Sequence, residues 1–479
     1  MGRTVRMLGM LAVLLAGLLR TGATPVRGTG FVVNSYFDDA DAHDASPGDC
    51  LCADTYGWCT LRAAVEEANA CPGTDTITFA TAMAIFVGNS PGSFQLYETV
   101  TIDASSVWDT ANNAPGVQIN GKGGSFSGLY VNASSCRIYG LTITAFGGDG
   151  ILVVSAANQI GGTGAGQRNV LSGNGTGLSL YSSSAQNNTV VNNYLGLTPA
   201  GDAANPNETG LFIGNGADDN FIGGSGAGKG NVISGNTYDG VLVEGLGTDN
   251  NWIEGNAIGV AANLSTALGN GAWGIRVRDG AANNTIGGVG GSGNLVSYSA
   301  YSGIYVHNSS GTQITSNLIS GNGSDGIDIS DSTASAVGNN LITGNALNGV
   351  RVEGASAAGN LIWNNSIYGN GGKGIYLQNG GNMGIAAPAI TSAGPFGAAG
   401  TTCPSCRVAL YSDSSDEGQV YHDILWADAS GTWTYFGGPL TGPNLTATSI
   451  DTSGNTSEFS APYLLVPKKV FLPLVSRKP

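Results

Sequence analysis

One short pattern repeats along the middle of the chain: a glycine, an apolar residue, a variable residue and a second apolar residue. Ten copies start at Gly128, Gly150, Gly177, Gly210, Gly240, Gly274, Gly303, Gly326, Gly349 and Gly374. Neighbouring copies are 22 to 34 residues apart. Alternation of apolar and variable positions over such short runs predicts β-strands and not helices. A repeat of this length is typical of a solenoid.

A second pattern between these copies begins and ends with asparagine, as in residues 231–236, 340–345 and 360–365. Strands that recur once per turn pair with the same strand of the next turn, which gives parallel sheets with a strand spacing of about 4.8 Å. Glycine and asparagine suit the corners, because both tolerate left-handed backbone. Stacked asparagine side chains can also satisfy buried amides of the turns. We therefore predict an all-β, parallel β-helix over residues 76–384.

The composition excludes several other classes of protein. The 479 residues include 78 glycines, and only 11% are charged, whereas an average globular chain has about 7% glycine and about 25% charge. Ordinary helical folds are therefore disfavoured. Recurring valine, isoleucine and leucine oppose disorder, and glycines that do not occupy every third position oppose collagen. The net charge of −15 and the lack of a basic patch oppose nucleic-acid binding.

The start of the chain predicts export. Residues 1–23 combine a basic start, an apolar run and small residues, as in a secretory signal peptide. An uncleaved membrane anchor is the alternative, but the apolar run is shorter than the ~20 residues that a spanning helix needs. We expect a secreted or cell-surface protein that has no transmembrane segment after cleavage and is a monomer.

Both ends of the solenoid are expected to be covered, because open parallel edges invite further chains to pair. Residues 24–75 predict a cysteine-rich capping module, in which residues 60–69 form an amphipathic helix capped by Thr60. Residues 385–465 alternate as antiparallel strands and predict a small β-sandwich. Residues 466–479 form a basic, proline-punctuated tail without a structural prediction.

Six of the seven cysteines form two groups, Cys50, Cys52, Cys59 and Cys71 in one and Cys403 and Cys406 in the other. In an exported chain, such groups favour disulfides. A zinc site is the alternative for the first group, but the spacing lacks paired C-x2-C motifs. Cys403 and Cys406 have the spacing of a redox motif without its strand-to-helix setting, so a structural disulfide is the better interpretation. Cys136 is left unpaired.

Several segments resemble known families. Residues 34–69, with Cys59-Thr60-Leu61-Arg62-Ala63-Ala64, resemble the N-terminal Cys-Ser-Leu-Arg-Glu-Ala module of secreted bacterial proteins, with Thr60 for serine and Ala63 for glutamate. The repeat, clearest in residues 230–236, is similar to the right-handed parallel β-helix repeats of the pectin-lyase-like superfamily. Residues 388–460 resemble Ig-like modules that follow such helices. Residues 469–475 resemble a C-terminal signature of surface proteins from filamentous bacteria.

This resemblance implies an all-β, right-handed parallel β-helix with a helical N-terminal cap and a C-terminal Ig-like β-sandwich. It implies no single activity, because the superfamily hosts lyases, hydrolases, epimerases and adhesins. The motifs that mark two of its enzyme families are missing. The sequence contains neither the Asn-Thr-Asp, Gly-His-Gly and Arg-Ile-Lys set of polygalacturonases nor the Arg-x-Pro-x-x-Arg of pectate lyases.

One outward face of the predicted solenoid gathers charged and aromatic residues. In the repeated pattern the apolar residues point inward, so the variable residue and the residue after the pattern point outward in two columns. In the second half of the repeat these columns contain Glu244, Arg276, Arg278, Tyr305, His307, Asp328, Arg351, Glu353 and Tyr376. Neighbours within a column are expected about 5 Å apart.

This face predicts engagement of an extended polysaccharide or cell-surface glycan. The candidate substrate-binding residues are Arg276, Arg278, Tyr305, Tyr376 and Glu244. Tyrosine faces stack on sugar rings and arginines pair with uronate carboxylates. The candidate catalytic residues are Asp328, Arg351, His307 and Glu353.

Two reactions fit these residue types. In a polysaccharide lyase, an arginine or His307 would abstract the proton beside the uronate carboxylate, with Asp328 or Glu353 holding Ca²⁺ or neutralising charge. In a glycoside hydrolase, two carboxyl groups would flank the bond. The densest acidic set is Asp325, Asp328 and Asp331.

A face of alternating arginine, aspartate and glutamate is also what any soluble parallel sheet needs on its wet side. The competing function is therefore a non-catalytic cell-surface adhesive or structural protein.

Two further features carry weaker hypotheses. The acidic loop of residues 38–49 could bind Ca²⁺, although its spacing lacks the glycine and terminal glutamate of an EF-hand. Two long insertions, residues 196–208 and 259–272, could wall a groove or could equally be neutral insertions.

Overall fold

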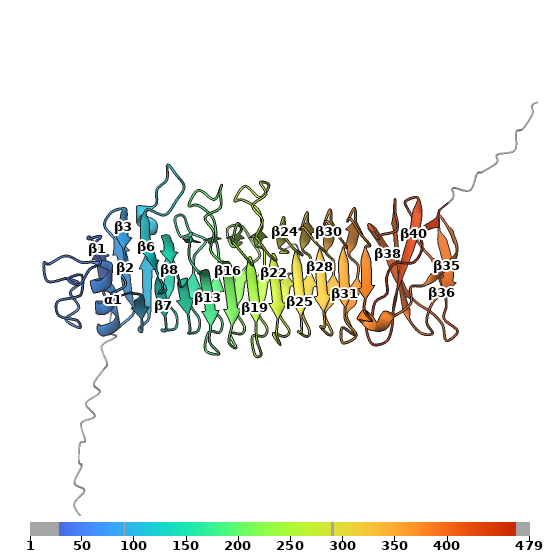
Figure 1. Ribbon diagram of the computed structural model, residues 1–479, viewed down its shortest axis with the longest axis horizontal. Helices are drawn as coiled ribbons and strands as arrows, with labels where there is room; N and C mark the ends of the chain where they lie inside the picture. Colours follow the sequence, from blue (N-terminus) through green and yellow to red (C-terminus); the bar gives the residue numbers. More distant parts are fainter. Residues whose placement is uncertain (1–27, 91, 289–291, 466–479) are drawn as a thin grey trace, which may run out of the picture.

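The computed structural model describes residues 28–90, 92–288 and 292–465. These form a long rod of three parallel β-sheets, followed by two small antiparallel sheets at its C-terminal end (Figure 1). The predicted signal peptide, residues 1–23, and the tail, residues 466–479, lie outside the described residues. Among the described residues, helix is confined to α1 (Leu61–Ala70) and two short 3-10 turns, η1 (Ser105–Val107) and η3 (Gly381–Gly384). The all-β prediction is confirmed.

Each long sheet takes one strand from each coil of the rod. Sheet A contains β1 (Gly30–Val33), β2 (Asp75–Phe79), β5 (Val100–Asp103), β8 (Arg137–Tyr139), β11 (Gln159–Ile160), β14 (Thr189–Val190), β17 (Phe221–Gly223), β20 (Trp252–Glu254), β23 (Thr285–Gly287), β26 (Gln313–Thr315), β29 (Ala336–Gly338) and β32 (Leu361–Trp363). Sheet B contains β3 (Met83–Phe86), β6 (Val117–Gly124), β9 (Leu141–Phe146), β12 (Val170–Ser172), β15 (Tyr194–Leu195), β18 (Val232–Ile233), β21 (Ala257–Ile258), β24 (Leu295–Ser297), β27 (Leu318–Ser320), β30 (Leu341–Thr343) and β33 (Ser366–Tyr368).

Sheet C faces the viewer in Figure 1. It contains β4 (Phe94–Leu96), β7 (Leu129–Val131), β10 (Asp149–Val153), β13 (Thr176–Tyr181), β16 (Thr209–Gly214), β19 (Val241–Glu244), β22 (Ile275–Arg278), β25 (Ile304–His307), β28 (Ile327–Ser330), β31 (Val350–Glu353) and β34 (Ile375–Gln378). Its last ten strands carry the ten copies of the glycine pattern. The first, β4, was not predicted, because no glycine precedes its apolar residues.

The core of the rod consists of the inward apolar positions of each strand. In β31, Val350 and Val352 are fully buried, whereas Arg351 and Glu353 between and after them are partly exposed. In β28, Ile327 and Ile329 are likewise fully buried, and the outward Asp328 and Ser330 are buried as well. Stacking of these positions from coil to coil gives one continuous hydrophobic core, as the short period-two runs predict.

Three ladders of asparagines run along the corners of the rod, all of them buried except Asn370, which is partly buried. Between sheets A and B lie Asn169, Asn193, Asn231, Asn256, Asn294, Asn317, Asn340 and Asn365; between B and C lie Asn174, Asn207, Asn236, Asn270, Asn322, Asn345 and Asn370; between C and A lie Asn158, Asn188, Asn220, Asn251, Asn284, Asn360 and Asn382. A rung joins asparagines of adjacent coils, and the third ladder is interrupted at Thr312 and Ser335, between Asn284 and Asn360. The Nδ2 of Asn317, for example, donates to Oδ1 of Asn340 at 3.0 Å, and this oxygen also accepts from the Asn317 backbone amide at 2.9 Å. The predicted ladders are confirmed.

The N-terminal end of the rod is closed by α1, whose Thr60 side chain caps the helix by accepting from the Ala63 amide at 3.0 Å. Arg62 points into this end and forms a buried ion pair with Asp38, with 2.6 Å between Nε and Oδ1. Two disulfides, Cys50–Cys71 and Cys52–Cys59, tie the preceding loop to the helix. Disulfides and not zinc ligation therefore explain this cysteine group.

The strand β1 is part of the rod, because it pairs in parallel with β2 in sheet A. The sequence placed this segment in the capping module. Phe31 and Val33 alternate with exposed residues, but no glycine pattern marks the strand, so its place in the sheet depends on pairing with a strand more than 40 residues away.

The C-terminal end is covered by two antiparallel sheets. One contains β35 (Ala389–Gly394), β36 (Gly397–Thr401) and β39 (Thr432–Phe436); the other contains β38 (Val420–Trp426), β37 (Arg407–Asp413), β40 (Asn444–Ile450) and β41 (Tyr463–Leu464). Side chains of this region accept hydrogen bonds from backbone amides at the open end of the rod. Glu458 accepts from the Leu377 amide at 3.1 Å, and Thr456 accepts from the Ile362 amide at 2.8 Å. The third disulfide, Cys403–Cys406, closes a turn here, and Cys136 is a free, buried cysteine.

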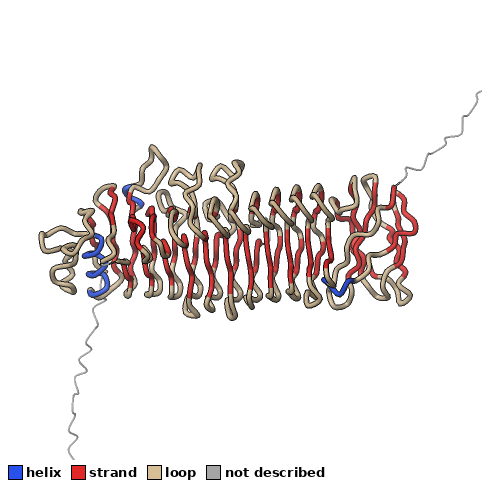
Figure 2. The backbone as a smooth tube through the Cα atoms, viewed as in Figure 1, coloured by secondary structure: helices blue, strands red, loops and turns tan. Residues whose placement is uncertain are grey.

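The two long insertions, predicted either to wall a groove or to be neutral insertions, pack on sheet B. They project from the rod (Figure 2) and fold back over the outer face of sheet B. Leu197 and Val260, one from each insertion, are buried against the outward residues Val170, Tyr194 and Val232 of that sheet. The insertions therefore form a second, smaller apolar cluster outside the main core.

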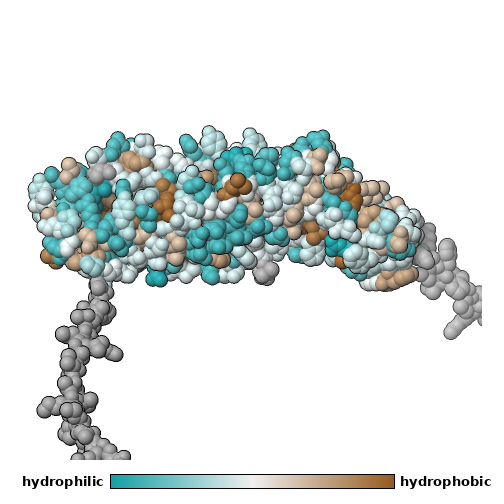
Figure 3. Space-filling model, turned by 90° about the horizontal axis from the view of Figure 1, so that it is seen from below, coloured by the Kyte–Doolittle hydropathy of each residue, from teal (hydrophilic) through white to brown (hydrophobic). Residues whose placement is uncertain are grey.

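Within the described residues, no helix has the length and apolar character needed to cross a lipid bilayer. Seen from below, the middle of the rod has a mainly hydrophilic surface with isolated apolar residues (Figure 3).

Candidate functional site

The two predicted outward columns exist, and they run in register along sheet C. Adjacent strands align Arg276 with Tyr305, Tyr305 with Asp328, and Asp328 with Arg351, and the column continues to Tyr376. The second column aligns Glu244, Arg278, His307, Ser330 and Glu353. All nine candidate residues therefore lie on one surface, called the sheet C strip below.

Arg351 is the centre of a cluster of three carboxyl groups. Its guanidinium donates to Asp328 and to Glu353, the latter at 2.7 Å. Its Nε lies 3.1 Å from Oδ2 of Asp325, too poorly aligned for a hydrogen bond but close enough for an ion pair. Asp325 lies in the turn before β28 and also accepts from the Asn348 amide at 2.9 Å. One positive charge thus faces three carboxyl groups.

Asp328, one of these three carboxyl groups, is only 3% exposed. Burial raises its pKa from 3.8 to about 6, although the hydrogen bond and charge of Arg351 oppose the rise. The neighbouring carboxylates Asp325 and Glu353 add to it. One oxygen of Asp328, Oδ1, is buried and has no hydrogen-bond partner among the described residues. The other oxygen, Oδ2, accepts the hydrogen bond from Arg351.

The other two arginines of the strip are also held by carboxylates. Arg278 Nε donates to Glu244 across the strand pair at 2.7 Å, and Asp279 lies 3.4 Å away. Arg276 lies 3.8 Å from Asp239, a buried carboxyl group whose pKa is raised by burial. The strip therefore pairs three arginines with six carboxyl groups in all. It is acidic.

The aromatic residues of the strip stack on one another. Tyr305 lies 5.2 Å from the ring of Trp273 at an interplanar angle of 15°, and 5.8 Å from His307 at 12°. Trp273 lies in the turn before β22, and His307 lies two residues after Tyr305 on β25. Tyr305 therefore packs against two neighbouring rings within the strip. Arg276 lies 4.2 Å above the ring of Trp273.

Two further aromatic residues beside the strip were not predicted from the sequence. Trp273 and Tyr301 lie in the turns that lead into β22 and β25, and their rings are 5.0 Å apart. Neither occupies a position in the repeated pattern, so the outward columns could not include them. A tryptophan directly before the glycine of the pattern was the available signal.

His307 and Tyr376 complete the strip. The Nδ1 of His307 is buried and has no hydrogen-bond partner among the described residues. Tyr376 lies beside Arg351 in the column, with the ammonium of Lys373 5.0 Å above its ring. Lys373 in turn pairs with Glu458 at 2.6 Å.

The described part of the chain contains no group of three or more His, Cys, Asp or Glu side chains placed to hold a metal ion. In the acidic loop, Asp38 pairs with Arg62, and Asp44 accepts from the amides of Ser46 and Ala53 at 2.8 and 3.0 Å. These carboxylates organise the loop. On sheet C, Asp328 and Glu353 are bound to Arg351, which explains their proximity without Ca²⁺.

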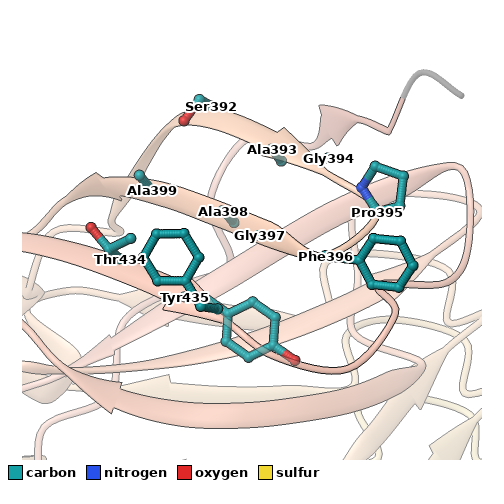
Figure 4. Close-up of a pocket in the computed structure, with 11 residues that line it drawn as sticks. Ser392, Ala393, Gly394, Pro395, Phe396, Gly397, Ala398, Ala399, Thr434 and Tyr435 are labelled. Carbon is teal, nitrogen blue, oxygen red and sulfur yellow. The ribbon is translucent and has the colours of Figure 1, made fainter. Parts of the chain in front are cut away.

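A wide groove of about 800 Å³ lies at the C-terminal end of the molecule, along the sheet formed by β35, β36 and β39 (Figure 4). Phe396 and Phe436 line it and are 66% and 86% exposed. Its lining has no acidic, basic, histidine or cysteine side chain. It therefore offers apolar contact and no acid–base chemistry.

Comparison with known proteins supports the fold. Residues 203–386 match a family model described as a right-handed β-helix region. The rod is a right-handed parallel β-helix. None of the curated proteins matches this chain.

Several solved structures are similar at low identity. The A-module of the mannuronan C-5 epimerase AlgE6 of Azotobacter vinelandii is 17% identical, with a TM-score of 0.41 over 72% of this chain and 99% of that one. The Dettilon tailspike protein is 14% identical, with a TM-score of 0.45 over 88% and 78%. The periplasmic alginate epimerase AlgG is 11% identical, with a TM-score of 0.34 over 64% and 76%. Likenesses this distant carry no information on the activity of the present chain.

Proposed function

We propose that the protein is exported and binds an extended, neutral glycan along the sheet C strip without cleaving it. The observation that carries this proposal is the pairing of every arginine in the strip with carboxyl groups of the protein itself. A lyase needs a free base and a cation for the uronate, and a hydrolase needs two accessible carboxyl groups. Here Asp328 is buried and Arg351 is held by three acids.

Charge favours a neutral chain over a uronate polymer. Six carboxyl groups against three arginines leave the strip negative, and the whole chain carries −15. Like charges raise the free energy of an anionic ligand here. A neutral sugar chain can instead donate its hydroxyl protons to Glu244 and Glu353, whose carboxylates are partly exposed and have acceptor capacity left. Six coils in register suit an extended ligand.

The flanking regions complete the proposal. The N-terminal module and the C-terminal Ig-like sandwich would cap the rod and attach it outside the cell, after removal of residues 1–23. Three disulfides support an oxidising compartment. In this view the rod presents the strip at a distance from the surface that holds it.

The test combines binding and cleavage. The mature protein is incubated with insoluble or immobilised neutral polysaccharides, namely cellulose, chitin, xylan and mannan, and with polygalacturonate and alginate. Bound protein, new reducing ends and absorbance of unsaturated uronates are followed with and without Ca²⁺. We expect retention by at least one neutral polymer and neither product. Failure to bind any neutral polymer by a folded protein overturns the proposal.

Variants locate the site. His307→Ala removes a side chain from the middle of the strip and Tyr376→Ala removes one from its C-terminal end, and both should weaken retention. Tyr56→Ala is the matched control, because Tyr56 is an equally polar, 70% exposed tyrosine of the N-terminal loop. Equal retention of all three variants would place the glycan elsewhere.

A second candidate function is glycoside hydrolysis with Asp328 as the general acid. It is favoured by the pKa of about 6, which suits a proton donor near neutral pH. It requires Arg351 to move when substrate binds. Reducing ends that form in the wild type and vanish in Asp328→Asn would establish it in place of simple binding.

A further inference from the structure

A groove of about 390 Å³ lies on the outer face of sheet A, on a different side of the rod from the sheet C strip. It crosses the strands β11, β14, β17 and β20. Its lining residues include Gln159, Thr189, Phe221, Trp252, Lys229 and Glu254. Its volume falls in the range of about 300–1,000 Å³ that is typical of small-molecule sites.

The groove exists because long and short turns alternate between adjacent coils. After β11 and β17 the chain makes glycine-rich loops, Gly161-Gly162-Thr163-Gly164 and Gly223-Gly224-Ser225-Gly226, before the next corner asparagine. After β14, between them, the chain reaches Asn193 in three residues. The floor over Thr189 and Val191 therefore lies between two raised loops, which supply Thr163 on one side and Gly224 and Ser225 on the other.

Two aromatic rings are placed side by side in this groove. Phe221 and Trp252 are register partners on adjacent strands and are 46% and 43% exposed. Within the described residues, neither ring is stacked on another aromatic ring, in contrast to Tyr305 on sheet C. A ligand in the groove can therefore contact both side chains. Such half-exposed, adjacent rings are costly to leave in water unless something covers them.

Fixed polar groups surround the rings. Glu254 Oε1 accepts from the Ser225 amide at 3.1 Å and Oε2 from the Ser292 hydroxyl at 3.3 Å, which anchors the carboxylate in the wall and leaves each oxygen one further lone pair. The amide nitrogen of Gln159 donates to the Gly161 carbonyl at 3.1 Å, which fixes its carbonyl oxygen as an acceptor. Lys229 supplies a donor. One positive and one negative side chain make the groove neutral overall.

We propose that this groove is a second ligand site, which binds a neutral mono- or disaccharide. A pyranose has an apolar face of C–H groups, which packs on an aromatic ring, and an equatorial rim of hydroxyls. Phe221 and Trp252 would hold that face, and Glu254, Gln159 and Lys229 would bind the rim. Balanced charge disfavours an acidic sugar, and the loops on either side limit the length of the ligand. The site does not depend on the sheet C strip.

The test is saturation-transfer NMR and calorimetry of the full mature chain with millimolar cellobiose, chitobiose, maltose, lactose and mannobiose, with digalacturonate as the acidic comparison. We expect at least one neutral disaccharide to bind and digalacturonate not to bind. Trp252→Ala should weaken binding about tenfold or more through loss of the stacking face. Glu254→Gln, which keeps the shape of the wall, should weaken it less.

Tyr56→Ala should leave disaccharide binding unchanged, and circular dichroism should confirm that each variant is folded. Because Trp252 points away from the core, its loss should not alter retention on insoluble polysaccharides by the sheet C strip. Retention that survives in Trp252→Ala while disaccharide binding is lost separates the two sites. Lack of binding to every neutral disaccharide, or binding that Trp252→Ala leaves intact, overturns the proposal.

Discussion

Arg351 on β31 donates a hydrogen bond to Asp328, its register partner on β28. Asp328 is 3% exposed, whereas the Arg351 side chain is 26% exposed, so the acid is the more deeply buried partner of the pair. A cross-strand pair on the wet face of a sheet is normally solvated on both sides. Here Asp328 is buried, so its proton affinity and its effect on the stability of the fold both depend on Arg351.

The first prediction concerns pH. The pKa of Asp328 is raised from 3.8 to about 6, so the folded state binds more protons than the unfolded state between these values. Its contribution to stability is complete below about pH 4 and is lost as the pH rises through about 6. A shift of this size corresponds to about 3 kcal/mol. Asp328→Asn removes this titration.

We therefore expect the free energy of unfolding of the wild type, relative to Asp328→Asn, to fall by roughly 3 kcal/mol between about pH 4 and pH 7. Urea unfolding followed by tryptophan fluorescence measures both proteins at each pH. A difference that stays constant over this range would show that Asp328 titrates near its ordinary value in the folded protein.

A second prediction compares two arginines. Arg351→Met leaves three carboxyl groups without a counter-charge, two of them buried, and should destabilise the protein by about 3–5 kcal/mol at neutral pH. Arg278→Met removes a pair in which both side chains are about 30% exposed, and should cost less than about 1 kcal/mol. Equal losses in urea unfolding would mean that the Arg351 cluster is as solvated as the Arg278 pair.

The sequence predicted the outward columns well, because period-two alternation dictates which side chains share a face whatever the coil length. The neighbours of Asp328 and Arg351 follow from this rule alone. The third acid, Asp325, comes from a turn, and its approach to Arg351 depends on the path of that turn. The same limit applies to Trp273, whose ring reaches Tyr305 from outside the strand.

The groove on sheet A could not be predicted from the pattern either. It requires that turns of different length follow one another along the rod, so that a short coil lies between two raised loops. The strands on either side look alike in sequence. The position of β1 could not be predicted for a similar reason. A four-residue strand with alternating apolar residues can pair with any open sheet edge, and only the assembled sheet determines that β1 pairs with β2.

A third prediction concerns the disulfides. Cys50–Cys71 spans 21 residues, whereas Cys403–Cys406 spans three. Loop-closure entropy then gives about 3 kcal/mol for the first and about 2 kcal/mol for the second. Replacing Cys50 and Cys71 by alanine should also loosen the N-terminal cap specifically. Limited proteolysis should cut residues 38–58 first in that variant and should leave this loop intact in the Cys403→Ala, Cys406→Ala variant.

The last prediction concerns a missing rung in an asparagine ladder. Ser299 occupies the ladder position between Asn270 and Asn322, and its backbone amide donates to Asn322 Oδ1 at 3.1 Å as an asparagine there would. The Ser299 hydroxyl is buried and has no hydrogen-bond partner among the described residues. Two side-chain bonds of the ladder are therefore lost at this coil.

Ser299→Asn should restore both bonds, one accepted from Asn270 and one donated to Asn322. At about 0.5–1.5 kcal/mol for each bond, the free energy of unfolding should rise by about 1–2 kcal/mol. The reverse change, Asn236→Ser in the same ladder, should lower it by a similar amount or more, because it leaves Asn207 Nδ2 without the acceptor it now has at 3.0 Å. A destabilised Ser299→Asn would mean that this corner is too tight for the larger side chain, and that the serine is there for space.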